Sequence, residues 1–118
     1  MRAKSIAMAD DYDNRFAALQ QDYLERVAGH VERLEELGTG LRAGVDRETF
    51  DELHGLVHRL AGTGETMGFP AIGRAAQSLE AHLEAADGPA ELAGGEAAEA
   101  VEAFCDRLRD ILEAQSEP

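Results

Sequence analysis

The sequence predicts an all-α protein, an antiparallel up-down four-helix bundle with a short N-terminal arm or extra helix. Two observations support this fold class. Ala, Leu and Glu dominate the composition and β-branched residues are few, which favours helices over strands. Apolar residues also recur at steps of three or four in four separate segments, the period of a helix with one buried face. Because the connections between these segments are short, neighbouring helices are expected to pack antiparallel.

Residues 1–10 have no apolar periodicity and are expected to form the arm or extra helix, with the four-helix domain over 11–116. The first helix of the bundle is expected from Asp11 to the Gly-Thr-Gly turn at 38–40, because glycine disfavours the helix interior. Its expected apolar face consists of Phe16, Leu19, Tyr23, Val27, Val31 and Leu34.

A second helix is expected to begin after Asp46, a residue type that caps helix N-termini, and to end at Gly68. Acidic Glu48 in its first turn favours this start, because negative charge is stabilised at the positive end of the helix dipole. The expected apolar face consists of Phe50, Leu53, Val57, Leu60 and the small residue Gly64.

The third helix is expected to begin at Pro70, because proline suits the first turn of a helix, and to break at 87–89. Its apolar face consists of Ile72, Ala75, Ala76, Leu79, Leu83 and Ala86. A short piece rich in Ala, Glu and Leu and the pair Gly94-Gly95 separate it from a fourth helix. That helix carries Val101, Phe104, Cys105, Leu108, Ile111 and Leu112 on its apolar face.

Length and charge limit the possible functions. The 118 residues suffice for one domain. With 24 acidic against 11 basic residues and a net charge of −13, the chain lacks the cationic surface that nucleic acids and anionic membranes require. Its opening residues lack the apolar run of a signal peptide, no segment is apolar enough to span a membrane, and the lone Cys105 cannot form an internal disulfide. We therefore expect a cytoplasmic protein that binds neither nucleic acid nor membrane.

The second helix is unusual on its polar side. On a helical wheel His58 lies roughly 120° from the centre of the apolar face, which predicts a solvent-facing ring, while His54 lies roughly 80° away, at the margin of the core. Gly55 and Gly62 flank His58 at −3 and +4, although a glycine inside a helix costs about 1 kcal/mol relative to alanine. They indicate a surface cleared for another molecule to reach the imidazole, or else defects that the rest of the helix tolerates.

An exposed imidazole is suited to covalent catalysis. Such a ring ordinarily titrates near pH 6.5, so it is mostly neutral in cytoplasm, and its free nitrogen is a nucleophile that can carry a phosphoryl group. The proton on the other nitrogen must then be held by an acceptor, which selects the tautomer and orients the ring. A carboxylate or amide on a neighbouring helix would provide that acceptor.

The run from His58 to Phe69 and the residues that follow resemble the signature of histidine-containing phosphotransfer (Hpt) domains. The matching positions after the histidine are Leu60, Gly62, Gly68, Ile72, Leu79 and Glu80. The resemblance implies that His58 accepts the phosphoryl group, that Gly62 gives a receiver domain room to dock, and that Glu80 accepts a hydrogen bond from the imidazole. One position departs from the family, because Ala61 replaces its frequent lysine. Arg59 or Arg74 would then compensate the phosphoryl charge.

These observations predict a monomeric phosphorelay carrier that moves a phosphoryl group between receiver-domain aspartates through His58. It would not be an enzyme, since the sequence contains no nucleotide-binding loop, and Mg²⁺ would come from the receiver. Its partners would be response-regulator receiver domains or a hybrid histidine kinase. The docking surface is predicted at Gly55, Leu56, Arg59, Ala61 and Gly62, with parts of the first helix.

Two alternatives accompany this prediction. The chain could be an interaction module that binds and inhibits a receiver or kinase without using His58. His54 and His58, four residues apart, could also clamp a metal ion, but two surface histidines make a weak site. We therefore predict no metal site.

Overall fold

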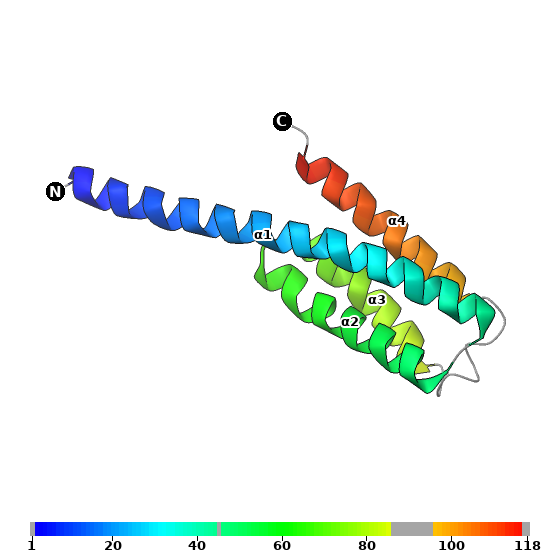
Figure 1. Ribbon diagram of the computed structural model, residues 1–118. Helices are drawn as coiled ribbons and strands as arrows, with labels where there is room; N and C mark the ends of the chain where they lie inside the picture. The colour runs from blue at the N-terminus through cyan, green and yellow to red at the C-terminus, as the bar shows by residue number, and fades with distance from the viewer. Residues whose placement is uncertain (1, 45, 86–95, 117–118) are drawn as a thin grey trace.

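The computed structural model describes residues 2–44, 46–85 and 96–116. Its four helices are α1 (Arg2–Ala43), α2 (Arg47–Thr66), α3 (Pro70–Ala85) and α4 (Glu96–Ser116). Successive helices run in opposite directions, so the chain forms the expected antiparallel up-down bundle (Figure 1). The described residues include no strand. No described helix has the length and apolar content needed to cross a membrane.

Helix α1 is longer than predicted at both ends. It runs without a break from Arg2, so residues 2–10 are its first turns and form neither a loose arm nor a separate helix. The predicted end at 38–40 is also wrong, because Gly38 is a packing position: a side chain there would begin 3.3 Å from Cγ1 of Val101 on α4. The burial of α1 against α4 outweighs the weak helix propensity of glycine. The helix ends instead before Gly44, whose φ of +148° favours glycine.

The other predicted ends are confirmed where the structure describes them. The side chain of Asp46 accepts a hydrogen bond of 2.7 Å from the backbone N–H of Thr49 and caps α2. Gly68 has a φ of +89° in the connection after α2, and Pro70 is the first residue of α3. The predicted break at 87–89, the short piece after it, Ala86 and the pair Gly94-Gly95 lie outside the described residues.

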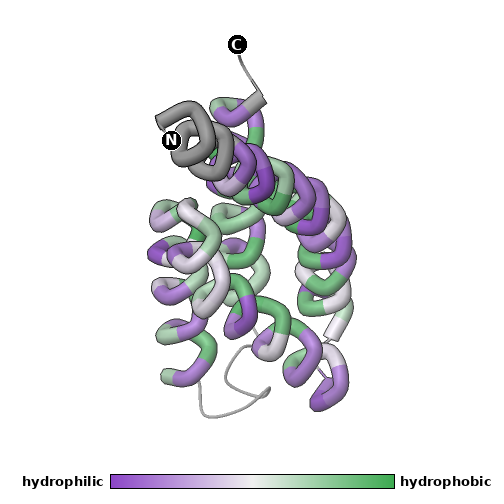
Figure 2. Tube along the Cα trace, turned by 90° about the vertical axis from the view of Figure 1, so that its left-hand side faces the viewer, coloured by the Kyte–Doolittle hydropathy of each residue, from purple (hydrophilic) through white to green (hydrophobic). Residues whose placement is uncertain are grey.

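The core is built from the apolar faces of all four helices, and Figure 2 shows hydrophobic residues gathered where the helices face one another. Every predicted core residue of α2 is buried, and those of α3 and α4 that the structure describes are buried or half-buried. The largest fully buried side chains are Leu34, Leu53, Leu60, Ile72, Leu83 and Leu108.

The apolar face of α1 is the exception. Phe16 and Leu19, predicted to lie in the core, are 37% and 57% exposed, as is Tyr12 at 72%. The reason is length: α1 has 42 residues and α2 only 20, so this part of α1 has less helix surface to pack against. The core begins on α1 at Leu24.

Ion pairs join α1 to its neighbours across the surface. Arg42 contacts Glu102 at 2.6 Å, and Arg109 pairs with Glu35, which links α1 to α4. Such exposed pairs each contribute at most about 1 kcal/mol, so apolar burial stabilises the bundle.

Cys105 faces the core of α4 and is 2% exposed. Burial, with the negative charges of Asp106 and Glu102, raises the pKa of its thiol to about 11. Because the thiolate is the reactive form, we expect the native chain to resist iodoacetamide at about pH 8 and the urea-unfolded chain to react fully, as measured by mass spectrometry. Rapid labelling of the native chain would contradict this burial.

Candidate functional site

His58 lies on α2 with its side chain 70% exposed, which confirms the wheel prediction. Its Nδ1 is hydrogen-bonded to Oε2 of Glu80, which projects from α3 and is only 16% exposed. Within the part of the chain that the structure describes, Nε2 makes no hydrogen bond. The ring is therefore held at one nitrogen by the adjacent helix and is open to solvent at the other.

A contact between two glycines brings the two helices together. A side chain at Gly64 of α2 would begin 2.5 Å from the backbone nitrogen of Gly73 on α3, so only glycine fits there. His58 precedes Gly64 by six residues, and Glu80 follows Gly73 by seven. At about 1.5 Å per residue these offsets are about 9 and 10.5 Å in the same direction, because the helices are antiparallel. The glycine contact thus sets both the spacing and the register that bring Glu80 to His58.

One turn earlier on α2, His54 makes a second cross-helix contact. Its Nε2 lies 3.4 Å from Oε1 of Glu84, one turn beyond Glu80 on α3. The ring is stacked between two others, with centroids 6.1 Å from Phe50 and 6.4 Å from His58. As predicted, His54 lies at the core margin, with a side chain 34% exposed.

The surface around His58 agrees with the prediction at the glycines but not at the larger residues. Side chains added at Gly55 or Gly62 would meet nothing within 4 Å, so neither glycine is required by packing inside this chain. Leu56 and Ala61, predicted to belong to the docking surface, are instead 3% and 8% exposed and lie in the core. Both were assigned to that surface as neighbours of His58, but α2 is covered by the other helices over a wider arc than its main apolar face.

Arg59 and Arg74 are both exposed, as charge compensation would require. Neither forms a hydrogen bond or ion pair with His58 or Glu80 among the described residues. Arg59 also affects a residue of α1. The pKa of His30 is lowered by burial and by the positive charges of Arg59 and Arg26. Arg59 therefore lies on the α1 side of the site.

Because Gly62 has open space around its Cα, we expect Gly62→Ala to raise the free energy of unfolding by about 0.5–1 kcal/mol through helix propensity. Urea denaturation followed by circular dichroism measures the change. A destabilised variant would contradict the open surface. A stabilised one would show that the fold does not require this glycine.

Sequence reasoning missed Glu84. The chain carries many acidic residues on exposed helix faces, and nothing in the spacing within α3 distinguishes this one. What marks Glu84 is a matched spacing on two antiparallel helices. His54 and His58 on α2 are four residues apart, and so are Glu80 and Glu84 on α3. In the observed register of these two helices, His54 lies opposite Glu84 and His58 lies opposite Glu80.

Comparison with known protein families agrees with the observed fold. A family model described as "Hpt domain" matches residues 18–117, which is most of the chain. No curated protein and no solved structure matches the chain significantly.

Proposed function

This chain belongs to the family of Hpt domains, phosphotransfer carriers of two-component signalling rather than enzymes, and on this premise we propose that His58 is its phosphoryl acceptor. Members of the family interact with receiver domains and kinases. The observation that supports the proposal is the hydrogen bond between Nδ1 of His58 and Glu80, because it leaves Nε2 available on an exposed ring.

In the proposed step, the lone pair of Nε2 attacks the phosphorus of an aspartyl phosphate in the receiver. A P–N bond forms, the P–O bond to the aspartate breaks, and the aspartate leaves as a carboxylate. The ring keeps its proton on Nδ1 and so gains a positive charge, which the Glu80 carboxylate stabilises. The reverse step returns the phosphoryl group to a receiver.

The partner has to provide the remaining charge stabilisation. The transition state spreads negative charge over the phosphoryl oxygens, and we assign the Mg²⁺ that neutralises it to the receiver. On this chain the exposed Arg59, next to His58, is a nearer candidate for charge compensation than Arg74, which lies six residues from Glu80 on α3. The bare backbone at Gly55 and Gly62 leaves room for the receiver to approach.

We propose further that the chain acts as a monomer, because His58 and its orienting carboxylate come from the same chain. It would work in the cytoplasm, the compartment expected from the sequence, with receiver domains or a hybrid histidine kinase as partners.

The proposal is tested by incubating the chain with a panel of receiver domains charged by acetyl phosphate. We expect a phosphorylated product that is stable in base and labile in acid, formed by the wild type and absent from His58→Ala. The matched control is His82→Ala, which removes an exposed histidine of α3 and should be labelled like the wild type. Circular dichroism verifies that each variant is folded.

Labelling of His58→Ala, or no transfer from any receiver, would overturn the carrier role. In the second case the chain would be an interaction module, and unlabelled receiver would still bind it in a pull-down.

A further inference from the structure

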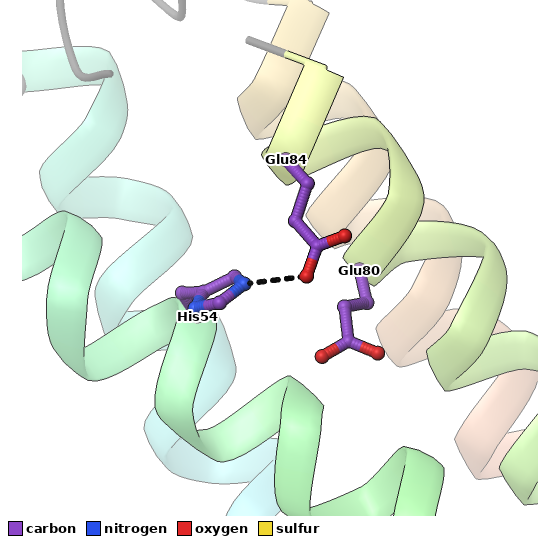
Figure 3. Close-up of side chains that lie close together, drawn as sticks. All are labelled: His54, Glu80 and Glu84. Atoms are coloured by element: carbon purple, nitrogen blue, oxygen red, sulfur yellow. Dashed lines mark hydrogen bonds and ion pairs between the residues drawn. The ribbon is translucent and has the colours of Figure 1, made fainter. Parts of the chain in front are cut away.

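The fold places three potential metal ligands together beside the phosphoacceptor. Figure 3 shows His54 on α2 facing Glu80 and Glu84 on α3. One ligand atom from each of the three lies within 4.8 Å of the others, and Nε2 of His54 is 3.4 Å from Oε1 of Glu84. We propose that His54, Glu80 and Glu84 bind one zinc ion.

The geometry suits a tetrahedral ion. Zinc bonds of about 2.0–2.2 Å place neighbouring tetrahedral ligands about 3.3–3.6 Å apart. The His54–Glu84 separation already has this value, and a ligand atom of Glu80 lies within 4.8 Å of both. A rotation of the Glu80 side chain would complete a three-ligand site, with water as the fourth ligand. An imidazole with two carboxylates favours zinc over Mg²⁺ or Ca²⁺, which prefer six or more oxygen ligands.

The surroundings also favour a cation. Glu80 and Glu84 are one helical turn apart, so their like charges repel each other in the metal-free protein, and a divalent ion would remove that repulsion. The ring of His54 is stacked between Phe50 and His58, which restricts its motion. Arg47 lies 5.6 Å from the centre of the Phe50 ring and pairs with Asp51. Among the described residues it pairs with neither Glu80 nor Glu84.

The site shares one ligand with the phosphotransfer site. Oε2 of Glu80 accepts the hydrogen bond from Nδ1 of His58, and the same carboxylate would bind the zinc ion. Zinc on Glu80 neutralises the charge that stabilises the phosphorylated ring, so zinc-bound chain should accept a phosphoryl group more slowly. This coupling rests on the proposed function, whereas zinc binding itself does not.

Zinc binding is measured on the chain alone by isothermal titration calorimetry and by competition with a coloured zinc indicator. We expect one zinc per chain, and an affinity at least tenfold lower in His54→Ala and in Glu84→Ala. His82→Ala is the matched control and should bind as the wild type does. Equal affinities in all four proteins, or one zinc per two chains, would overturn the site.

The coupling is measured by the rate of transfer from a phosphorylated receiver with and without zinc. We expect zinc to slow transfer about tenfold to the wild type and to have little effect on transfer to Glu84→Ala. Because both proteins receive the phosphoryl group from the same receiver, any effect of zinc on the metal site of the receiver is the same in the two measurements. Equal slowing of both proteins would overturn the coupling and leave the binding result intact.

Discussion

Gly64→Ala is expected to lower the free energy of unfolding by about 2–3 kcal/mol, although alanine is the better helix former. Its Cβ would lie 2.5 Å from the nitrogen and 2.9 Å from the Cα of Gly73, and both are backbone atoms of α3 that no rotamer change can move. The two helices must separate, which loosens the core around them. For a chain of this size the melting temperature should fall by about 10 °C.

The matched control is Gly62→Ala, two residues away on the same helix, which makes the same chemical change in open space and should stabilise the chain. Thermal and urea denaturation by circular dichroism compare the two variants. If both changed stability in the same direction, the close approach of α2 and α3 at Gly64 would be wrong.

Glu80→Ala is expected to slow the proposed phosphoryl transfer to His58 by about 10–100-fold, the effect found when the hydrogen-bond partner of a metal-binding histidine is removed. The imidazole would lose the acceptor for its Nδ1 proton, and with it both its orientation and the negative charge opposite the phosphorylated ring. Glu80→Gln keeps an acceptor oxygen but not the charge, so its rate should lie between those of the wild type and Glu80→Ala. Rapid-quench measurements with a phosphorylated receiver give the three rates.

A suitable control is Glu32→Ala, which removes an exposed acidic residue of α1 and should leave the rate unchanged. A Glu80→Ala rate equal to that of the wild type would show that the hydrogen bond does not contribute to transfer. Glu80→Gln as slow as Glu80→Ala would assign the effect to charge and not to orientation.

The exposure of His58 and the core faces of α2, α3 and α4 could be predicted from the sequence, because they depend on the geometry of a single helix. A period of 3.6 residues separates the apolar face from the opposite side whatever the partner helix is. The capping role of Asp46 and the start at Pro70 are local in the same sense, since the groups involved lie within one turn.

The pairing of His58 with Glu80 entered the prediction through resemblance to a family, because an exposed acidic residue on α3 has no local feature to distinguish it. The same reasoning left Glu84 unnoticed and weighed His54 as a metal ligand only together with His58. Which carboxylate lies opposite which imidazole depends on the register of two helices, and that register is set where Gly64 meets Gly73.

By itself, then, the sequence determined four amphipathic helices and an imidazole on the polar side of the second one, because those properties follow from spacing along one helix. Only the tertiary structure decided that α1 continues through Gly38, that Leu56 belongs to the core and that Phe16 lies outside it. Each of these depends on whether another helix packs against the residue at its position along the bundle axis. Burial against a neighbour outweighs the local propensity of one residue, and the absence of a neighbour leaves an apolar side chain in water.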